Sequence, residues 1–266
     1  MRVAPIIIVS LLACVAPSAG QRTAAPDGRS VAEQIRDRDQ GRDARFDVRM
    51  RLIDRQGAAR ERRFTMMLLR GRQREDRVLL RFTQPTDIKG TGLLVWKHAA
   101  TESERFLFLP ALGRVRRVAG GEAQESFVGS DFSYEDIGGQ DLDAYTYDLV
   151  DANASAAGAD GVTYQSYKLL ARAKDPRAPY PVTVSQVDKA TFIVRHAELL
   201  DRAGERRKTY DVRKLAKVQG FWTALEATMA TERERTRTEL MVETPEYNVG
   251  LTDDDFSRRT LERSGS

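Results

Sequence analysis

Apolar and charged residues alternate along most of this chain. Between residues 45 and 52 the even positions are apolar and the odd positions are charged. A period of two places successive side chains on opposite faces of a β-strand, so this segment predicts a strand with one buried face. Turn-forming residues follow at Asp54–Gly57, and the alternation returns at Phe64, Met66 and Leu68. The two segments together predict a β-hairpin.

The same alternation recurs to the end of the chain and predicts a mainly β protein with about ten to twelve strands. Further apolar rows lie near residues 78–82, 94–96, 106–108, 145–149, 162–171, 181–188, 191–199, 221–229 and 236–242. Asp201–Gly204 has the composition of a hairpin turn, and the small polar residues 153–161 indicate a loop. No long linker or repeat divides these rows, so one domain is expected.

Helix signals are few. Ser30 and Glu33 have the spacing of a capping box, which predicts a polar helix of about three turns. Acidic residues at 253–255 favour a second helix near the end of the chain. A wide antiparallel sheet twists and must bury its apolar face, by closing into a barrel or by curling around something. These helices provide little cover, so an apolar concave surface is expected to remain partly free for a ligand.

The first twenty residues differ from the rest. Arg2 is the only charge before Gln21, and a short apolar run ends in small residues at Gly20. This is typical of a secretory signal peptide, so we expect residues 1–20 to be removed and residues 21–266 to form the mature domain in the periplasm. Cys14 is the only cysteine and lies in a loosely lipobox-like context, which leaves lipid anchoring as the alternative.

Charge and motifs exclude several functions. The 43 basic and 39 acidic residues are interspersed, which does not indicate nucleic-acid binding. His98 and His196 lack the spacing of metal ligands, and the chain has no GxSxG, Walker or GxGxxG motif. We therefore predict no metal, no cofactor and no enzymatic activity.

The segment 126–136, SFVGSDFSYED, is the remaining place for chemistry. Asp131 and Glu135 could act as the acid and base of a glycosidase. The simpler interpretation is structural: Ser130 or Asp131 caps a short helix, and acids in its first turn favour the helix dipole. Aromatic residues would then hold this helix on the sheet as a cap or lid. They are Phe127, Phe132 and Tyr134.

Several motifs in order resemble one family. They are Phe82-x-x-Pro85-x-x-Ile88-Lys-Gly90-Thr91-x-Leu93-Leu94, Phe108–Arg117, Ser126–Asp136, Pro179-Tyr-Pro181 and Val187–Phe192. Over residues 30–262 the chain resembles the bacterial outer-membrane lipoprotein-sorting proteins, the LolA-like proteins often encoded beside RND-type exporters. Val128 stands where the family more often has Met, and Phe108 where it often has Tyr. The resemblance is to the exporter-linked branch.

The resemblance implies an incomplete antiparallel β-barrel curled around a hydrophobic cavity, with helices as a lid. It also implies a carrier that takes up acyl chains of lipids or lipoproteins and makes contact with membranes. The expected cavity wall comprises Phe46, Val48, Met50, Phe64, Met66, Leu68, Val78, Leu80 and Trp96. The alternative is that these side chains only pack a closed core.

The expected partners are acyl chains and an RND-type inner-membrane exporter, with passage of cargo toward the outer membrane. An alternative function is a periplasmic adaptor that binds the exporter through its arginine-rich strand faces and carries no cargo. A hydrolase using Asp131 and Glu135 is the third hypothesis.

Overall fold

The structure is a computed structural model that describes residues 26–71, 75–98 and 101–263. The predicted signal peptide and Cys14 lie outside these residues. The strands are β1 (Asp43–Ile53), β2 (Ala59–Leu69), β3 (Arg77–Gln84), β4 (Gly92–Trp96), β5 (Glu104–Leu109), β6 (Arg114–Val118), β7 (Tyr145–Ala157), β8 (Thr163–Ala173), β9 (Val182–Asp188), β10 (Val194–Leu200), β11 (Arg206–Val218), β12 (Phe221–Thr231) and β13 (Thr236–Tyr247). The α-helices are α1 (Gly28–Asp37), α2 (Tyr134–Gly138) and α3 (Arg258–Glu262). Short 3₁₀ turns are η2 (Pro110–Leu112), η3 (Gly120–Gln124), η4 (Phe127–Gly129), η5 (Leu142–Ala144) and η6 (Asp253–Phe256).

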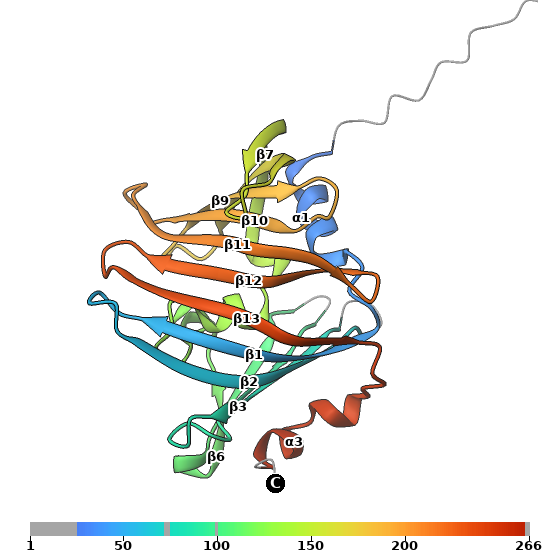
Figure 1. The fold of residues 1–266 in the computed structure, drawn as a ribbon, viewed down its shortest axis with the longest axis vertical. Helices are drawn as coiled ribbons and strands as arrows, with labels where there is room; N and C mark the ends of the chain where they lie inside the picture. Colours follow the sequence, from blue (N-terminus) through green and yellow to red (C-terminus); the bar gives the residue numbers. More distant parts are fainter. Residues whose placement is uncertain (1–25, 72–74, 99–100, 264–266) are drawn as a thin grey trace, which may run out of the picture.

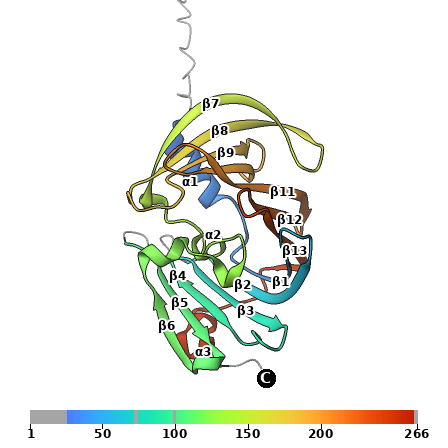
Figure 2. The same ribbon diagram turned by 90° about the vertical axis from the view of Figure 1, so that its left-hand side faces the viewer.

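The strands of the described residues form one sheet in the order β6-β5-β4-β3-β2-β1-β13-β12-β11-β10-β9-β8-β7. Every pairing is antiparallel, and only β1 and β13 pair across a long sequence separation. β6 and β7 stay at the edges, so the sheet curls without closing (Figures 1 and 2). This confirms the predicted incomplete antiparallel barrel.

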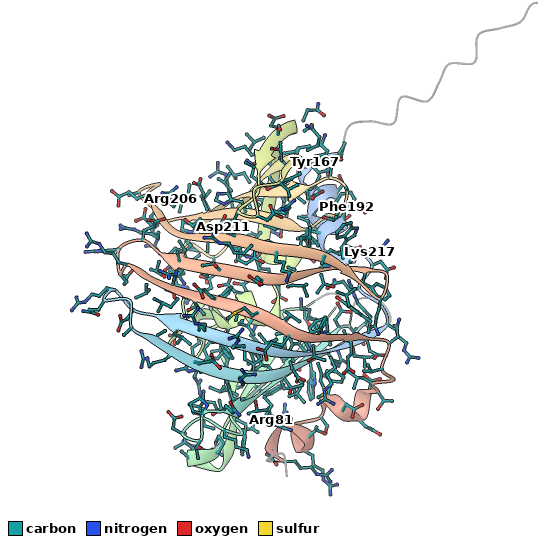
Figure 3. All side chains as sticks on the ribbon, in the orientation of Figure 1. Arg81, Tyr167, Phe192, Arg206, Asp211 and Lys217 are labelled. Carbon is teal, nitrogen blue, oxygen red and sulfur yellow. The ribbon has the colours of Figure 1, made fainter. Side chains whose placement is uncertain are left out.

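The outer face of β1, β2 and β13 explains the charged positions of the sequence. Arg49 lies 2.9 Å from Glu243, and Arg51 lies 2.9 Å from Glu239. Arg63 reaches the same Glu243 at 2.7 Å. Opposite charges on neighbouring strands support the sheet modestly. The polar face continues on β11, which carries Arg206, Asp211 and Lys217 at intervals along its length (Figure 3).

Helices cover both faces of the sheet at different places. On the inner face, α1 packs on β7 and β8, and α2 lies inside the curl (Figure 2). The start of α1 comes so close to β7 that a Cβ at Gly28 would stand 2.6 Å from the Tyr147 carbonyl oxygen. On the outer face, η6 and α3 cover β3–β6. Within the described residues, no helix combines the length and the apolarity needed to cross a membrane.

Two local predictions were wrong in detail. The helix α1 is present, but its N-cap is Asp27, whose side chain accepts a 2.7 Å hydrogen bond from the Ser30 amide. The predicted loop at 153–161 is strand as far as Ala157, because β7 pairs with β8 over that length after two register shifts. The hairpin turn at Asp201–Gly204 is confirmed by the Gly204 amide bond to the Asp201 carbonyl at 3.0 Å.

Candidate functional site: a partly apolar hollow inside the curled sheet

The segment 126–138 forms an inner cap on the sheet. Phe127 is fully buried, stacks on Phe82 at 5.7 Å between ring centroids, and meets Tyr134 edge-on at 5.4 Å. Phe132 approaches Tyr210 of β11 at 6.5 Å. Aromatic pairs at these distances add to the burial of apolar area. The three aromatic residues predicted for the lid thus reach the sheet from both sides of the curl.

Asp131 fastens this cap to the hairpin of β12 and β13. Its carboxylate accepts hydrogen bonds from the hydroxyls of Thr231, Thr236 (2.5 Å) and Thr238 (2.7 Å). Its carbonyl oxygen accepts a 2.5 Å bond from the Lys208 ammonium, and its amide donates to Thr238. A carboxylate saturated in this way is a structural anchor.

The short helix α2 begins at a cap different from the one predicted. Ser133 is the N-cap, and its hydroxyl accepts a 3.0 Å bond from the Asp136 amide. The Asp136 carboxylate in turn accepts a 2.8 Å bond from the Ser133 amide, which completes a capping box. The prediction of Ser130 or Asp131 as the cap was therefore wrong, because Asp131 is already engaged by the threonines.

Glu135 is a buried carboxyl within this cap. It accepts a 3.1 Å hydrogen bond from the Tyr145 hydroxyl. Burial raises the pKa of Glu135, although the Arg105 charge and the Tyr145 hydroxyl act in the opposite direction. The pKa of Tyr145 is also raised, by burial first and by Glu135 second.

This pKa shift predicts a pH-dependent stability. Because the folded protein holds the Glu135 proton more tightly than the unfolded chain, its contribution favours folding at low pH and is lost as pH rises through the raised pKa. Glu135→Gln, which is always neutral, should therefore have a higher Tm than the wild type at about pH 8, and this advantage should vanish toward about pH 4. The exposed Glu125→Gln is the control. An advantage that does not depend on pH would contradict this explanation.

A hollow of 440 Å³ remains inside the curl beside this cap. Its volume falls in the range of about 300–1,000 Å³ typical of pockets for small molecules. One wall comes from β1–β3, the opposite wall from β8–β10, and α1 and the end of α2 close the sides. Its apolar lining comprises Ala32, Ile35, Ala44, Phe46, Leu68, Leu69, Val78, Ile137, Leu142, Leu169, Ala171 and Val194.

The nine residues proposed for a cavity wall fall into three groups. Phe46, Leu68 and Val78 line the hollow. Five others pack with the cap in the inner core, and these are Val48, Met50, Phe64, Met66 and Leu80. Trp96 lies on the outer face with Phe106 and Phe256, away from the other eight. The cap thus fills one part of the concavity, and the hollow occupies the rest.

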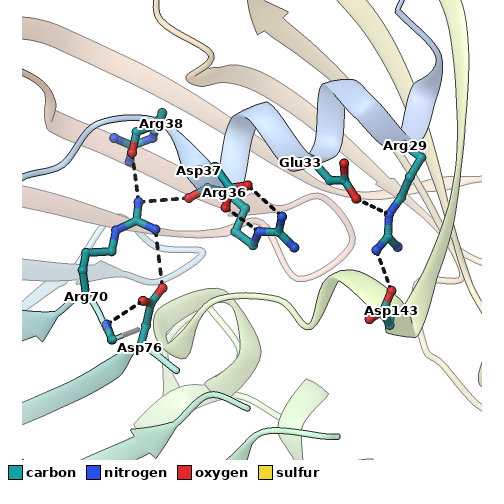
Figure 4. A network of polar contacts seen from close by, with 9 residues as sticks. Arg29, Glu33, Arg36, Asp37, Arg38, Arg70, Asp76 and Asp143 are labelled. Atoms are coloured by element: carbon teal, nitrogen blue, oxygen red, sulfur yellow. Dashed lines mark hydrogen bonds and ion pairs between the residues drawn. The ribbon is translucent and has the colours of Figure 1, made fainter. Parts of the chain in front are cut away.

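A polar network holds the end of α1 at the rim of the hollow (Figure 4). The Arg70 guanidinium donates 2.9 Å bonds to the carbonyl oxygens of Arg36 and Arg38 and lies 3.5 Å from Asp76. At the other end of the helix, Arg29 pairs with Glu33 at 3.0 Å and Asp143 at 2.7 Å. These contacts fix α1 between the two halves of the sheet.

A second hollow of 620 Å³, whose lining contains more charged residues, adjoins the first. Five residues line both hollows: Arg36, Asp76, Lys97, Gln140 and Leu142. Lys97 therefore lies at the boundary between the two hollows. The turn after α2 makes room for it, since a Cβ at Gly139, where φ is +83°, would collide with the Lys97 ammonium.

Several residues of the hollow were not predicted from the sequence. Ile35, Leu142 and Leu169 are isolated apolar residues whose role depends on elements far apart in the chain. The charged residues Arg38 and Lys97 carry no local signal, because one follows a helix and the other follows a strand. The apolar residues Val31, Ala32 and Ile35 share one helix face, and this spacing is the signal that could have identified the inward side of α1.

The two histidines pair with carboxylates. His98 lies 3.2 Å from Glu104, and His196 lies 2.9 Å from Asp211. In the part of the chain that the structure describes, no three His, Cys, Asp or Glu side chains converge in an arrangement that could hold a metal ion.

Solved structures with this architecture define the class as open, curled antiparallel sheets of the LolA type. An outer membrane lipoprotein-sorting protein domain from Vibrio parahaemolyticus is 26% identical, with a TM-score of 0.80 over 89% of this chain and 98% of that one. A DUF1329 family protein from Desulfovibrio piger is 27% identical, with a TM-score of 0.78 over 88% and 97% of the two chains. A LolA superfamily protein from Nitrosomonas europaea shares the fold at 16% identity, with a TM-score of 0.69 over 89% and 100%.

Residues 74–263 match a family model whose description reads "uncharacterized protein". The chain belongs to this LolA-like family, as its sequence motifs predicted. No curated protein matches the chain.

Proposed function

We propose that this protein is a periplasmic, non-enzymatic carrier that takes acyl chains of lipids or lipoproteins into the hollow beside α1. It passes them toward the outer membrane or an RND-type exporter. The observation that carries this proposal is the 440 Å³ hollow with apolar walls on both halves of the curled sheet. Each methylene buried there gains about 0.8 kcal/mol, so one acyl chain supplies substantial affinity without any polar contact.

The position of the cap supports a carrier over a hydrolase. Asp131 is engaged by three threonine hydroxyls, so one of the two carboxylates that the hydrolase would need is not available, although Glu135 accepts only one bond, from Tyr145, and lines the second hollow. The adaptor alternative depends on the arginine-rich outer faces. There Arg49, Arg51 and Arg63 are paired with glutamates of β13, which leaves less free charge for a partner.

The first test is native mass spectrometry of the mature protein purified from its own periplasm, followed by lipid extraction. A bound lipid or acylated peptide is the expected result. An empty protein that also fails to bind the neutral apolar probe N-phenyl-1-naphthylamine would contradict the carrier function and favour the adaptor.

A substitution in the wall should weaken the binding of this probe. Ala44 is buried, lines the hollow and pairs with Leu68, so Ala44→Phe should fill the space and weaken binding about tenfold or more. Ala58→Phe makes the same change at an exposed position of the β1–β2 hairpin and should bind normally. Ala171→Phe on the opposite wall is the second variant if the first one unfolds. If Ala44→Phe and Ala171→Phe both bind the probe normally, the probe binds outside the hollow.

A further inference from the structure

The apolar hollow has an unusual excess of positive charge. Six cationic residues line it, which are Arg36, Arg38, Arg42, Arg70, Arg77 and Lys97, against three acidic ones, which are Asp43, Asp76 and Asp136. A pocket for a bare hydrocarbon chain needs no such charge, and charge beside an apolar wall costs desolvation energy unless it is paired. The excess of cationic over acidic residues in this lining therefore needs a separate explanation.

The acids of the hollow are already engaged. Asp43 pairs with Arg42 at 3.1 Å, and Asp76 lies 3.5 Å from Arg70. Asp136 accepts the bond from the Ser133 amide in the α2 capping box. Each of these carboxylates thus already has a partner, although the Asp76 charge also acts on Lys97.

Among the described residues, three cations of the lining have no carboxylate partner, and of these Arg77 donates instead to the backbone carbonyl oxygens of Glu75, Asp76 and Lys97. Within residues 26–71, 75–98 and 101–263, the side chains of Arg38 and Lys97 have no hydrogen bond or ion pair with a carboxylate. The contact between Arg70 and Arg38 uses the Arg38 carbonyl oxygen, so the Arg38 guanidinium stays available (Figure 4). Burial lowers the pKa of both groups, and for Lys97 it outweighs the nearby Asp76 and Asp141 charges. An anion in the hollow would offset this cost.

We propose that the ligand of the hollow is an amphiphile with a single anionic head group, a phosphate or a carboxylate, held by Arg38 and Lys97 while its acyl chain lies on the apolar wall. This inference rests on the proposed carrier function and names its substrate class. Lys97 lies where the two hollows meet, so the head group would face the second hollow, whose lining contains more charged residues, and the chain would lie on the apolar residues of the first. Charge-assisted hydrogen bonds would then select the head group, and the hydrophobic effect would retain the chain.

The test compares compounds that share one tail. Dodecyl phosphate, dodecanoate, dodecanol and dodecyltrimethylammonium, each below its critical micelle concentration, compete with N-phenyl-1-naphthylamine for the full mature protein. The anionic compounds should displace the probe at concentrations about tenfold lower or more than dodecanol. Displacement by only one of the two anions identifies the head group as phosphate or carboxylate, whereas inorganic phosphate alone should displace nothing.

Variants assign the selectivity to the two cations. Lys97→Gln and Arg38→Gln should each reduce the preference for the anionic compounds about tenfold and leave displacement by dodecanol unchanged. Lys217→Gln, an exposed change on β11, should keep the full preference (Figure 3). Equal displacement by dodecanol and dodecyl phosphate in the wild type would overturn this inference but leave the carrier function intact. A protein that binds neither probe nor competitor would overturn both.

Discussion

Asp131→Ala is expected to lower the free energy of unfolding by about 3–5 kcal/mol, because it leaves a buried polar site without its central acceptor. Three threonine hydroxyls of the β12–β13 hairpin donate to this carboxylate, and two of them, those of Thr231 and Thr236, share one oxygen. Alanine would leave these three hydroxyl donors buried without an acceptor. Urea unfolding followed by circular dichroism measures the change, and the exposed Asp87→Asn should alter stability by less than about 0.5 kcal/mol.

The loss of stability in Asp131→Ala should be concentrated in the cap, residues 126–138. Asp131 connects the segment 126–138 to β12 and β13, while Phe127 still holds that segment on β3 through Phe82. Hydrogen exchange in Asp131→Ala should therefore rise first at 129–138 and later in the sheet. Asp131→Asn should lie between the two proteins, because an amide offers one acceptor oxygen where the carboxylate offers two. A cost below about 1 kcal/mol would show that the aromatic contacts alone hold the cap.

The sequence predicted the sheet well where one face meets water. In β1 the alternation of Val48, Arg49, Met50 and Arg51 identifies both the strand and its buried face, because outward residues pair with charges on β13. The full length of β7 was not predicted, because its last residues show no alternation of apolar and charged side chains. Residues 153–157 are small and polar and are held in a strand by pairing with β8, a contact that local composition does not reveal.

The face of a strand could not be predicted where both faces are buried. In β3 and β4 consecutive residues are apolar, as in Leu79-Leu80 and Leu93-Leu94, so the period of two disappears. Trp96 was placed on the inner wall by counting along such a strand, yet the register β3–β4 puts it on the outer face. Arg38 and Lys97 escaped prediction because only the tertiary fold brings the end of α1 to the end of β4.

The second large effect on stability is expected at the outer cover, in which η6 and α3 pack on β3–β6. Phe256 and Leu261 are almost fully buried there, and a Cβ at Gly92 would stand 2.7 Å from the Leu261 Cδ1. The Trp96 indole donates a 2.8 Å bond to the Phe256 carbonyl, and Arg81 donates to the Leu261 carbonyl at 3.1 Å. Large-to-small changes at such sites cost about 3–5 kcal/mol for Phe and about 2–5 kcal/mol for Leu.

The double variant Phe256→Ala/Leu261→Ala is therefore expected to lose about 5 kcal/mol or more, and Val249→Ala, at an exposed position before the cover, should be nearly neutral. Trp96 reports the opening directly, since the other tryptophan, Trp222, is 41% exposed and can be changed to Phe. In the Trp222→Phe protein that also carries the double substitution, the fluorescence emission of Trp96 should shift to the red as the cover detaches. An unshifted spectrum with normal stability would mean that the cover does not seal this face.

The same variant separates the two sides of the sheet. The cover buries Leu79, Leu94 and Phe106 from outside, whereas the hollow lies on the inner face between α1 and the walls. The sheet therefore gains core stability on its outer side and leaves the inner face open for the proposed cargo. Among the molecules that remain folded, the double variant should bind the apolar probe as tightly as the wild type does. A parallel fall in affinity would mean instead that β3 transmits the loss of its outer packing to Val78 in the wall of the hollow.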